Sequence, residues 1–171
     1  GQMQDAYEAY KKVSTYPMDP QMVALSRYWM ADILYRKNDL SGAINTYRDF
    51  INSPASNSLP EKVDAYYNIG YAYLDQGKRD EAIQSFRTYL QLNPDKANKV
   101  VDATFRVADA YYVNKQNLQA IQYYQQAYNL NSPLNDKALF YLAKAQGFNG
   151  QLPDKALTLT KLLKEAPASK Y

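Results

Sequence analysis

The sequence contains no cysteine and no histidine. Without cysteine, the chain has no disulfide bond, no thiolate ligand for a metal and no cysteine nucleophile. Without histidine, it also lacks imidazole ligands and the side chain that most often acts as a general base. These two absences argue against an enzyme, and we expect no catalytic residue, no metal site and no cofactor.

An excess of one charge and a long apolar run are also missing. The 20 basic and 17 acidic residues give a net charge of +3, which is too balanced to imply nucleic acid or an anionic membrane surface. No run approaches the roughly 18 apolar residues of a membrane helix, and no signal peptide or lipidation motif is visible. We therefore expect no nucleic-acid partner and no direct insertion into a membrane.

What the chain does contain is a repeated helical pattern, most clearly in residues 65–94, which read AYYNIGYAYLDQGKRDEAIQSFRTYLQLNP. This stretch resembles a tetratricopeptide repeat, a pair of short helices with small, bulky and aromatic residues at fixed positions and a proline at the end. The matching positions, with a glycine at the turn, are Tyr66, Ile69, Gly70, Tyr73, Gly77, Ala82, Phe86 and Pro94.

The pattern recurs along the chain. If Ala82 marks the second helix, its equivalents are Ala6, Ala43, Ala120 and Ala156, at intervals of 36 to 39 residues. These intervals exceed the usual period of about 34 residues in this family. The first helices carry small residues at one shared position, which are Ala31, Gly70, Ala108 and Ala143. The last unit needs one extra residue after Gly150, which indicates a shifted register in its second helix.

The resemblance implies an all-α fold, a right-handed superhelical solenoid of stacked helix-turn-helix pairs. A single array would cover residues 1–171: the second helix of a truncated repeat at 3–18, then repeats at 21–55, 60–94, 97–133 and 134–167. Because the first unit begins at a second helix, we interpret the chain as a piece of a longer protein. Periodicity and stop signals predict helices at 3–15, 21–37, 40–52, 60–76, 79–92, 97–114, 117–130, 134–148 and 153–165.

Local signals predict how some of these helices begin and are joined. Asp39, Asp80 and Asn117 precede second helices, where a side-chain oxygen can accept hydrogen bonds from the first free amides. Residues 52–60 lie around Pro54 and Pro60. We expect that connection to be free of helix, because proline disfavours helix at and before its position.

The resemblance also implies a concave face lined by the first helices. Positions that share that face form three rows: Tyr28, Tyr67, Phe105 and Phe140; Asp32, Tyr71, Asp109 and Lys144; and Tyr35, Leu74, Tyr112 and Gly147. Aromatic rings there would supply rigid contact area for a peptide or a partner surface, and Asp32 and Asp109, which packing does not require, would favour a basic segment. The candidate binding residues are Tyr28, Asp32, Tyr35, Tyr67, Tyr71, Phe105, Asp109, Tyr112, Phe140 and Lys144. The alternative is that the tyrosines only pack neighbouring helices.

Some members of the family bind a chaperone's terminal carboxylate through a clamp of lysine, asparagine and arginine side chains. At the equivalent positions only Asn68 and Arg106 match, while Tyr28 and Asp102 replace the two lysines. The sequence therefore disfavours this clamp.

Three functions remain open from the sequence. The first is a non-catalytic scaffold that binds another protein or a peptide in the groove. The second is an assembly module of a bacterial cell-envelope complex, because the chain resembles envelope repeat proteins; it would place the protein in the periplasm or envelope, with the cytoplasm as the alternative. The third is a carbohydrate-binding accessory domain. We also expect self-association through truncated repeat ends, since the first helix, with Tyr7, Tyr10 and Val13, lacks a paired helix.

Overall fold

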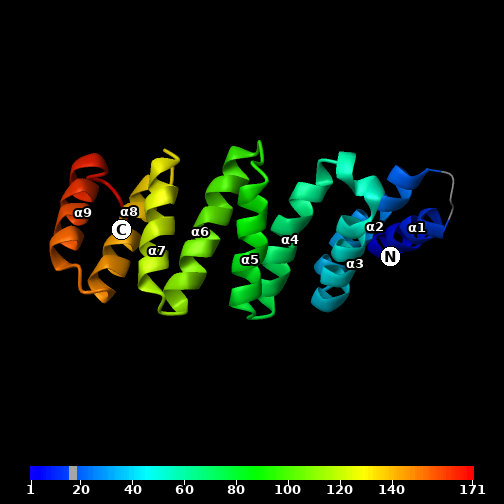
Figure 1. Cartoon of the computed structure of the whole chain (residues 1–171), viewed down its shortest axis with the longest axis horizontal. Helices are drawn as coiled ribbons and strands as arrows, with labels where there is room; N and C mark the ends of the chain where they lie inside the picture. The colour runs from blue at the N-terminus through cyan, green and yellow to red at the C-terminus, as the bar shows by residue number, and fades with distance from the viewer. Residues whose placement is uncertain (16–18) are drawn as a thin grey trace. The chain divides into compact units, whose positions relative to one another are not determined.

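The computed structural model describes residues 1–15 and 19–171, and this part of the chain is helical, with one 3-10 helix and no strand (Figure 1). The helices are α1 (Gln2–Thr15), α2 (Pro20–Arg36), α3 (Leu40–Asn52), η1 (Pro54–Ser58), α4 (Glu61–Asp75), α5 (Arg79–Gln91), α6 (Ala97–Val113), α7 (Asn117–Asn129), α8 (Asn135–Phe148) and α9 (Leu152–Glu165). The all-α prediction is confirmed, and every α-helix begins and ends within one residue of the predicted first and last residues. The end of the predicted segment 3–18, at residues 16–18, lies outside the described residues.

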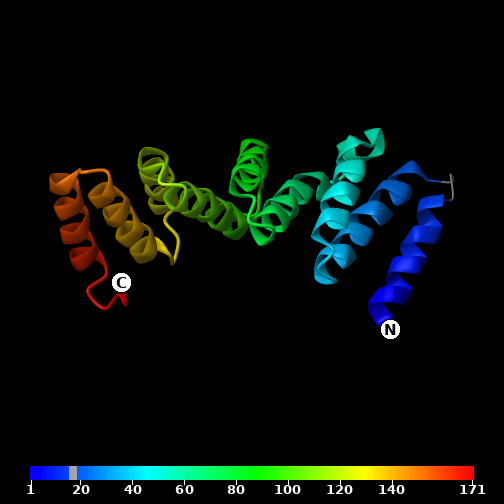
Figure 2. The same ribbon diagram turned by 90° about the horizontal axis from the view of Figure 1, so that it is seen from below.

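The chain divides into two compact units, Gly1–Leu92 and Asn93–Tyr171. In the first unit α1 packs on α2, α2 pairs with α3, and α4 pairs with α5. In the second unit α6 pairs with α7 and α8 pairs with α9, while α7 packs on α8. The paired helices run antiparallel within each unit, as the side view shows (Figure 1), and Figure 2 shows the same pairs from below. In the described part of the chain, no helix is both long and apolar enough to cross a membrane.

Each hairpin turn contains one residue with a positive φ, which fixes where the second helix starts. These residues are Asn38, Gly77, Lys115 and Gly150, with φ values of 64°, 74°, 59° and 77°. The amide after each one reaches back to the last turn of the first helix, as in the 2.9 Å bonds from Lys78 N to Tyr73 O and from Gln116 N to Tyr111 O. This is the Schellman arrangement, which satisfies carbonyls that the helix end leaves free.

The turns set the register of the second helices. Ala43, Ala82 and Ala120 each come five residues after the positive-φ residue, and all three are fully buried. The same count from Gly150 leads to Lys155, and Ala156 is exposed. The prediction that Ala156 is the packing residue of the last unit is therefore wrong. Gly147 makes room for the lysine instead, since a Cβ there would lie 3.0 Å from Lys155 Cδ.

Gly70 allows α4 and α5 to approach closely. A Cβ at Gly70 would lie 2.8 Å from ring atoms of Phe86, which is closer than carbon atoms can pack. The group that requires glycine at this position is thus the aromatic ring of Phe86. The equivalent residues Ala31, Ala108 and Ala143 are buried as well.

Only part of the predicted helix capping is confirmed. Asp39 caps α3, where its Oδ1 accepts a hydrogen bond from Gly42 N at 2.9 Å. The caps of α5 and α7 are Lys78 and Gln116, neither with a side-chain cap bond, so the predictions for Asp80 and Asn117 are wrong. Because the positive-φ turn consumes a fixed number of residues, both side chains fall inside the helix.

The prediction that the connection between α3 and α4 is free of helix is wrong. Residues Pro54–Ser58 form the 3-10 helix η1. Its Ser56 is fully buried, and the hydroxyl donates to Ser53 O at 2.8 Å and to Ile51 O at 3.1 Å. A proline at the first position of η1 is compatible with such a turn because its missing amide would have had no partner there.

Candidate functional site

Tyr28 belongs to the core of the first unit. Its ring is 7% exposed and packs edge-on against Tyr47 and Phe50, with centroid distances of 5.5 and 5.4 Å. Asn68 Nδ2 donates to the hydroxyls of Tyr28 at 3.2 Å and Tyr47 at 3.0 Å. Burial raises the pKa of Tyr28 to about 12. A ring so enclosed offers little surface to a ligand, so its main role is packing.

Two other candidates on α2 have partners within the first unit. Asp32 Oδ2 accepts from Arg36 Nε at 2.7 Å, one helical turn away. The Tyr35 hydroxyl donates to Asp75 Oδ2 at 2.6 Å and so joins α2 to α4. Burial, followed by this hydrogen bond, raises the pKa of Tyr35 to about 12.

The partly exposed aromatic residues of the first unit lie on α4. Tyr67 and Tyr71 are half-buried, with ring centroids 5.2 Å apart. Both rings pack edge-on against Phe86, at 5.7 and 5.3 Å. One side of each ring is thus fixed by packing while part of it reaches solvent.

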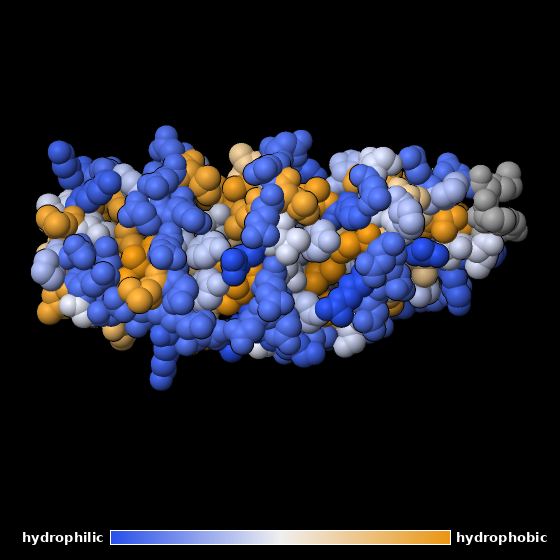
Figure 3. Space-filling model, in the orientation of Figure 1, coloured by the Kyte–Doolittle hydropathy of each residue, from blue (hydrophilic) through white to orange (hydrophobic). Residues whose placement is uncertain are grey.

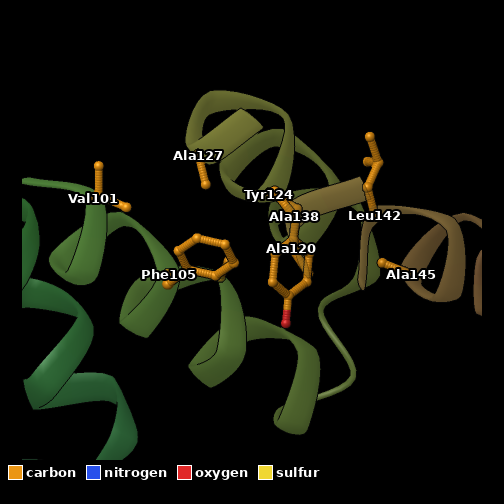
Figure 4. Close-up of a cluster of buried hydrophobic side chains, with 9 residues drawn as sticks. Val101, Phe105, Ala120, Tyr124, Ala127, Ala138, Leu142 and Ala145 are labelled. Atoms are coloured by element: carbon orange, nitrogen blue, oxygen red, sulfur yellow. The ribbon is translucent and has the colours of Figure 1, made fainter. Parts of the chain in front are cut away.

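In the second unit, Phe105 and Asp109 serve the core. Phe105 is 2% exposed and lies beside Tyr124, with ring centroids 6.3 Å apart (Figure 4). The hydroxyl of the fully buried Tyr124 donates to Asp109 Oδ1 at 2.6 Å. Burial, and next the charge of Asp109, raises the pKa of Tyr124 above its usual range. The expectation that packing does not require Asp109 is therefore wrong, because a buried hydroxyl needs an acceptor.

Lysines and aromatic rings meet on α8. Lys144 Nζ lies 5.7, 5.5 and 5.3 Å from the ring centroids of Tyr112, Phe140 and Tyr141. Lys137 Nζ lies 4.9 Å from the centroid of Phe105 and 5.9 Å from that of Tyr141. Both lysines and all of these aromatic residues except Phe105 are half-buried. We call Tyr112, Lys137, Phe140, Tyr141 and Lys144 the α8 surface.

The lysines of the α8 surface have no acidic partner in the described part of the chain: neither ammonium lies within 4.0 Å of a carboxylate oxygen. An ammonium near the face of an aromatic ring gains about 0.5–1 kcal/mol at exposed sites and more when desolvated. The rings therefore hold both cations in place while leaving them able to meet an anion.

A non-helical segment of the chain itself lies against α8. The Tyr171 ring is 5.4 Å from Phe140 and 6.2 Å from Tyr141 between centroids. Ser169 Oγ donates to Asp136 Oδ2 at 2.8 Å. The surface can thus receive a hydroxyl and an aromatic ring from a neighbouring polypeptide segment.

Sequence reasoning selected Tyr112, Phe140 and Lys144 but missed three residues beside the candidate sites. Lys137 and Tyr141 complete the α8 surface, and the seven-residue spacing of Lys137 and Lys144 could have indicated a shared helix face. The third is Trp29, 39% exposed. Together with Met3, Tyr10 and other residues of α1 and α2 it lines an open cavity of about 310 Å³.

Neither metal binding nor the chaperone clamp finds support in the described residues. They contain no group of three or more aspartate, glutamate, cysteine or histidine side chains that could hold a metal ion. Of the two clamp matches, Asn68 donates to two tyrosines, and Arg106 pairs with Asp102 at 3.3 Å. Both side chains are thus engaged within the fold.

Comparison with known proteins identifies the repeat. Two models described as tetratricopeptide repeat match the chain, one over residues 25–56 and the other over residues 63–96. No curated protein sequence matches it significantly.

Solved structures share the fold. MamA is 21% identical, with a TM-score of 0.72 over 96% of this chain and 82% of the MamA chain. A putative kinesin light chain with nearly identical TPR-like repeats, from Podosopora anserina, is 17% identical, with a TM-score of 0.70 over 100% and 90% of the two chains. YrrB, described as a TPR protein with an unusual peptide-binding site, is 21% identical, with a TM-score of 0.67 over 94% and 76%. At these identities the likeness shows the fold alone.

Proposed function

The chain belongs to the tetratricopeptide-repeat family, and from this premise we propose that it is a non-catalytic scaffold that binds a peptide segment of another protein on its first helices. Repeats of this kind bury a continuous core between stacked helices and leave side chains of one face for binding. The peptide-binding site named for YrrB supports the proposal by analogy of fold.

The observation that carries the proposal is the α8 surface. Aromatic side chains that are half-buried keep a rigid, partly exposed ring, and such rings dominate binding energy at protein interfaces. Phe140 and Tyr141 pack edge-on against each other, Tyr141 stacks on Tyr124 of α7, and both rings meet Tyr171. Tyr67 and Tyr71 form a second, smaller set of half-buried rings on α4.

The other candidate residues enter this proposal in different roles. Phe105 supports the α8 surface from within the core of the second unit, where Asp109 also holds Tyr124, whereas Tyr28 belongs to the core of the first unit. Asp32 and Tyr35 of α2 have intramolecular partners that a ligand would have to displace. A cell-envelope role, a periplasmic location and carbohydrate binding stay predictions of the sequence.

Selection of peptides from a random displayed library against the intact chain tests the proposal. We expect the selected peptides to lose at least about tenfold in affinity when Phe140→Ala removes a central ring of the α8 surface. Leu157→Ala is the matched control, since this exposed leucine lies on α9. Thermal unfolding of each variant checks that the fold is intact. Peptides that bind the Phe140→Ala chain as tightly as the original chain would move the site elsewhere.

A further inference from the structure

We propose that the α8 surface recognises an acidic peptide segment with a serine or threonine two residues before an aromatic residue, and that residues 166–171 occupy this place when no partner is bound. The inference rests on the proposed function and names the chemical class of its ligand. It is carried by the chain's own segment on α8 and by the two lysines beside it.

The segment at residues 166–171 shows which groups the surface accepts. Ser169 and Tyr171 stand two residues apart, and both reach α8: the hydroxyl of the first donates to Asp136, and the ring of the second packs on Phe140 and Tyr141. Tyr171 N also donates to Ser169 Oγ at 3.1 Å, which sets the two side chains relative to each other. A partner segment with the same spacing can make the same contacts.

The segment leaves one part of the surface unused. Its sequence is APASKY, which contains no acidic side chain. Lys137 and Lys144 remain half-buried over aromatic rings, without a carboxylate within 4.0 Å. A partner with glutamate or aspartate beside its aromatic residue adds charge-assisted hydrogen bonds that the chain's own segment does not make with these lysines. Such a partner therefore displaces residues 166–171.

The net charge of the second unit also favours an acidic partner. Residues 93–171 contain ten basic and six acidic residues, whereas residues 1–92 contain ten basic and eleven acidic ones. The positive charge of the whole chain thus belongs to the unit that carries the α8 surface. A cationic patch raises the rate at which an acidic partner arrives and lowers that of a basic one.

Lysines beside aromatic rings can also bind single-stranded nucleic acid. A carboxylate beside the α8 surface distinguishes the two ligands, however, because a phosphodiester linkage has no hydroxyl group to donate to it. This carboxylate, Asp136, accepts a hydroxyl, as a peptide serine provides. The arrangement therefore favours a polypeptide, and nucleic-acid binding becomes an outcome of the test.

Fluorescence anisotropy with labelled synthetic probes tests the proposal on the intact chain. The main probe is a short capped peptide in which tyrosine follows serine by two residues and glutamates flank the pair. The comparison probes replace tyrosine by alanine, replace the glutamates by lysines, or are a single-stranded oligothymidine. We expect the main probe to bind at least about tenfold more tightly than each of the others, and less tightly as salt is added.

Three variants locate the binding. Lys144→Gln should weaken the main probe about three- to tenfold by removing the cation, and Lys164→Gln, an exposed charge on α9, should leave it unchanged. Tyr171→Ala should tighten the probe, because it removes the internal competitor. Circular dichroism melting confirms that each variant is folded.

Several results would overturn the inference: equal effects of Lys144→Gln and Lys164→Gln, tighter binding of the lysine probe or of oligothymidine, or weaker binding by the Tyr171→Ala chain. If library peptides of another chemistry still depend on Phe140, the ligand class is wrong while the proposed scaffold function stands. If no peptide depends on Phe140, both are wrong.

Discussion

At the scale of single residues, the hairpin turns show which side chains the fold tolerates at a cost. The four turns need a positive φ, which glycine adopts freely and asparagine accepts, but one of them uses Lys115 at 59°. A side chain with a Cβ in this region costs about 1–2 kcal/mol. The same turn with Gly77 or Gly150 avoids this cost.

Replacing Lys115 by glycine should therefore stabilise the chain. We expect Lys115→Gly to raise the free energy of unfolding by about 0.5–1 kcal/mol, since relief of the positive φ exceeds the extra entropy of glycine in the unfolded chain. The matched control is Lys37→Gly, in the equivalent turn but at a φ of −82°, which should lower stability. Urea unfolding measures both. A less stable Lys115→Gly chain would contradict this reading of the turn.

Gly70 is a second residue with a specific requirement. Gly70→Ala should cost about 1–3 kcal/mol of folding free energy by overpacking, because the new methyl group meets the Phe86 ring. In a Phe86→Leu background the same substitution should cost much less, so a double-mutant cycle isolates the contact. Equal costs in both backgrounds would show that the ring is not the cause.

Sequence reasoning could predict some of these residues and not others, for a physical reason. The positions of Gly70 and Ala82 follow from the repeat pattern, since close helix contact demands small residues there. The role of Asp109 could not be read in that way, because it depends on how far the hydroxyl of Tyr124 reaches from another helix. The role of Lys155 could not be predicted either. Its side chain stands at the position that alanine occupies in the other second helices, and it fits because Gly147 leaves space for it.

At the scale of helices, tyrosine hydroxyls join neighbouring elements. Tyr35 joins α2 to α4, Asn68 joins α4 to tyrosines of α2 and α3, and Tyr124 joins α7 to α6. The pattern of aromatic residues predicted packing, but the hydrogen bonds add a dependence on protonation. Burial is the largest cause that raises the pKa of each of these four tyrosines, Tyr28, Tyr35, Tyr47 and Tyr124.

These tyrosines predict alkaline unfolding. In the unfolded chain their pKa is 10.0, while in the folded chain those of Tyr28 and Tyr35 are about 12. The folded chain therefore holds more protons within that window, so this contribution to stability is complete below pH 10 and falls as the pH rises towards 12. Thermal melting across this range, followed with tyrosinate absorbance, measures the effect.

The Tyr35→Phe variant separates one tyrosine from the rest. Without its hydroxyl the fall in melting temperature above pH 10 should be shallower than in the original chain. A melting temperature that does not change up to pH 12 would contradict the account.

At the scale of the whole molecule, apolar side chains on α9 predict self-association. Leu152, Ala156 and Leu163 lie on one side of this helix at 100° per residue, and all three are exposed. Figure 3 shows apolar side chains over α9 among polar ones. An apolar helix side of this kind gains free energy when a second copy covers it.

Sedimentation across a range of concentrations tests this prediction. We expect the average mass of the original chain to rise with concentration and that of Leu163→Lys to stay at the monomer value. Leu157→Lys is a close control, because both leucines are 70% exposed but Leu157 lies on another side of α9. A monomer at every concentration, or equal effects of the two variants, would contradict the prediction.

The central claim is that the α8 surface binds a peptide segment in place of the chain's own residues 166–171. Nuclear magnetic resonance on the isotope-labelled intact chain, titrated with the acidic serine–tyrosine probe, tests it most directly. The account predicts shifted amide signals from α8 and from residues 166–171, with those of α3 unchanged. Shifts confined to residues 1–92, or none at saturating probe, would contradict it.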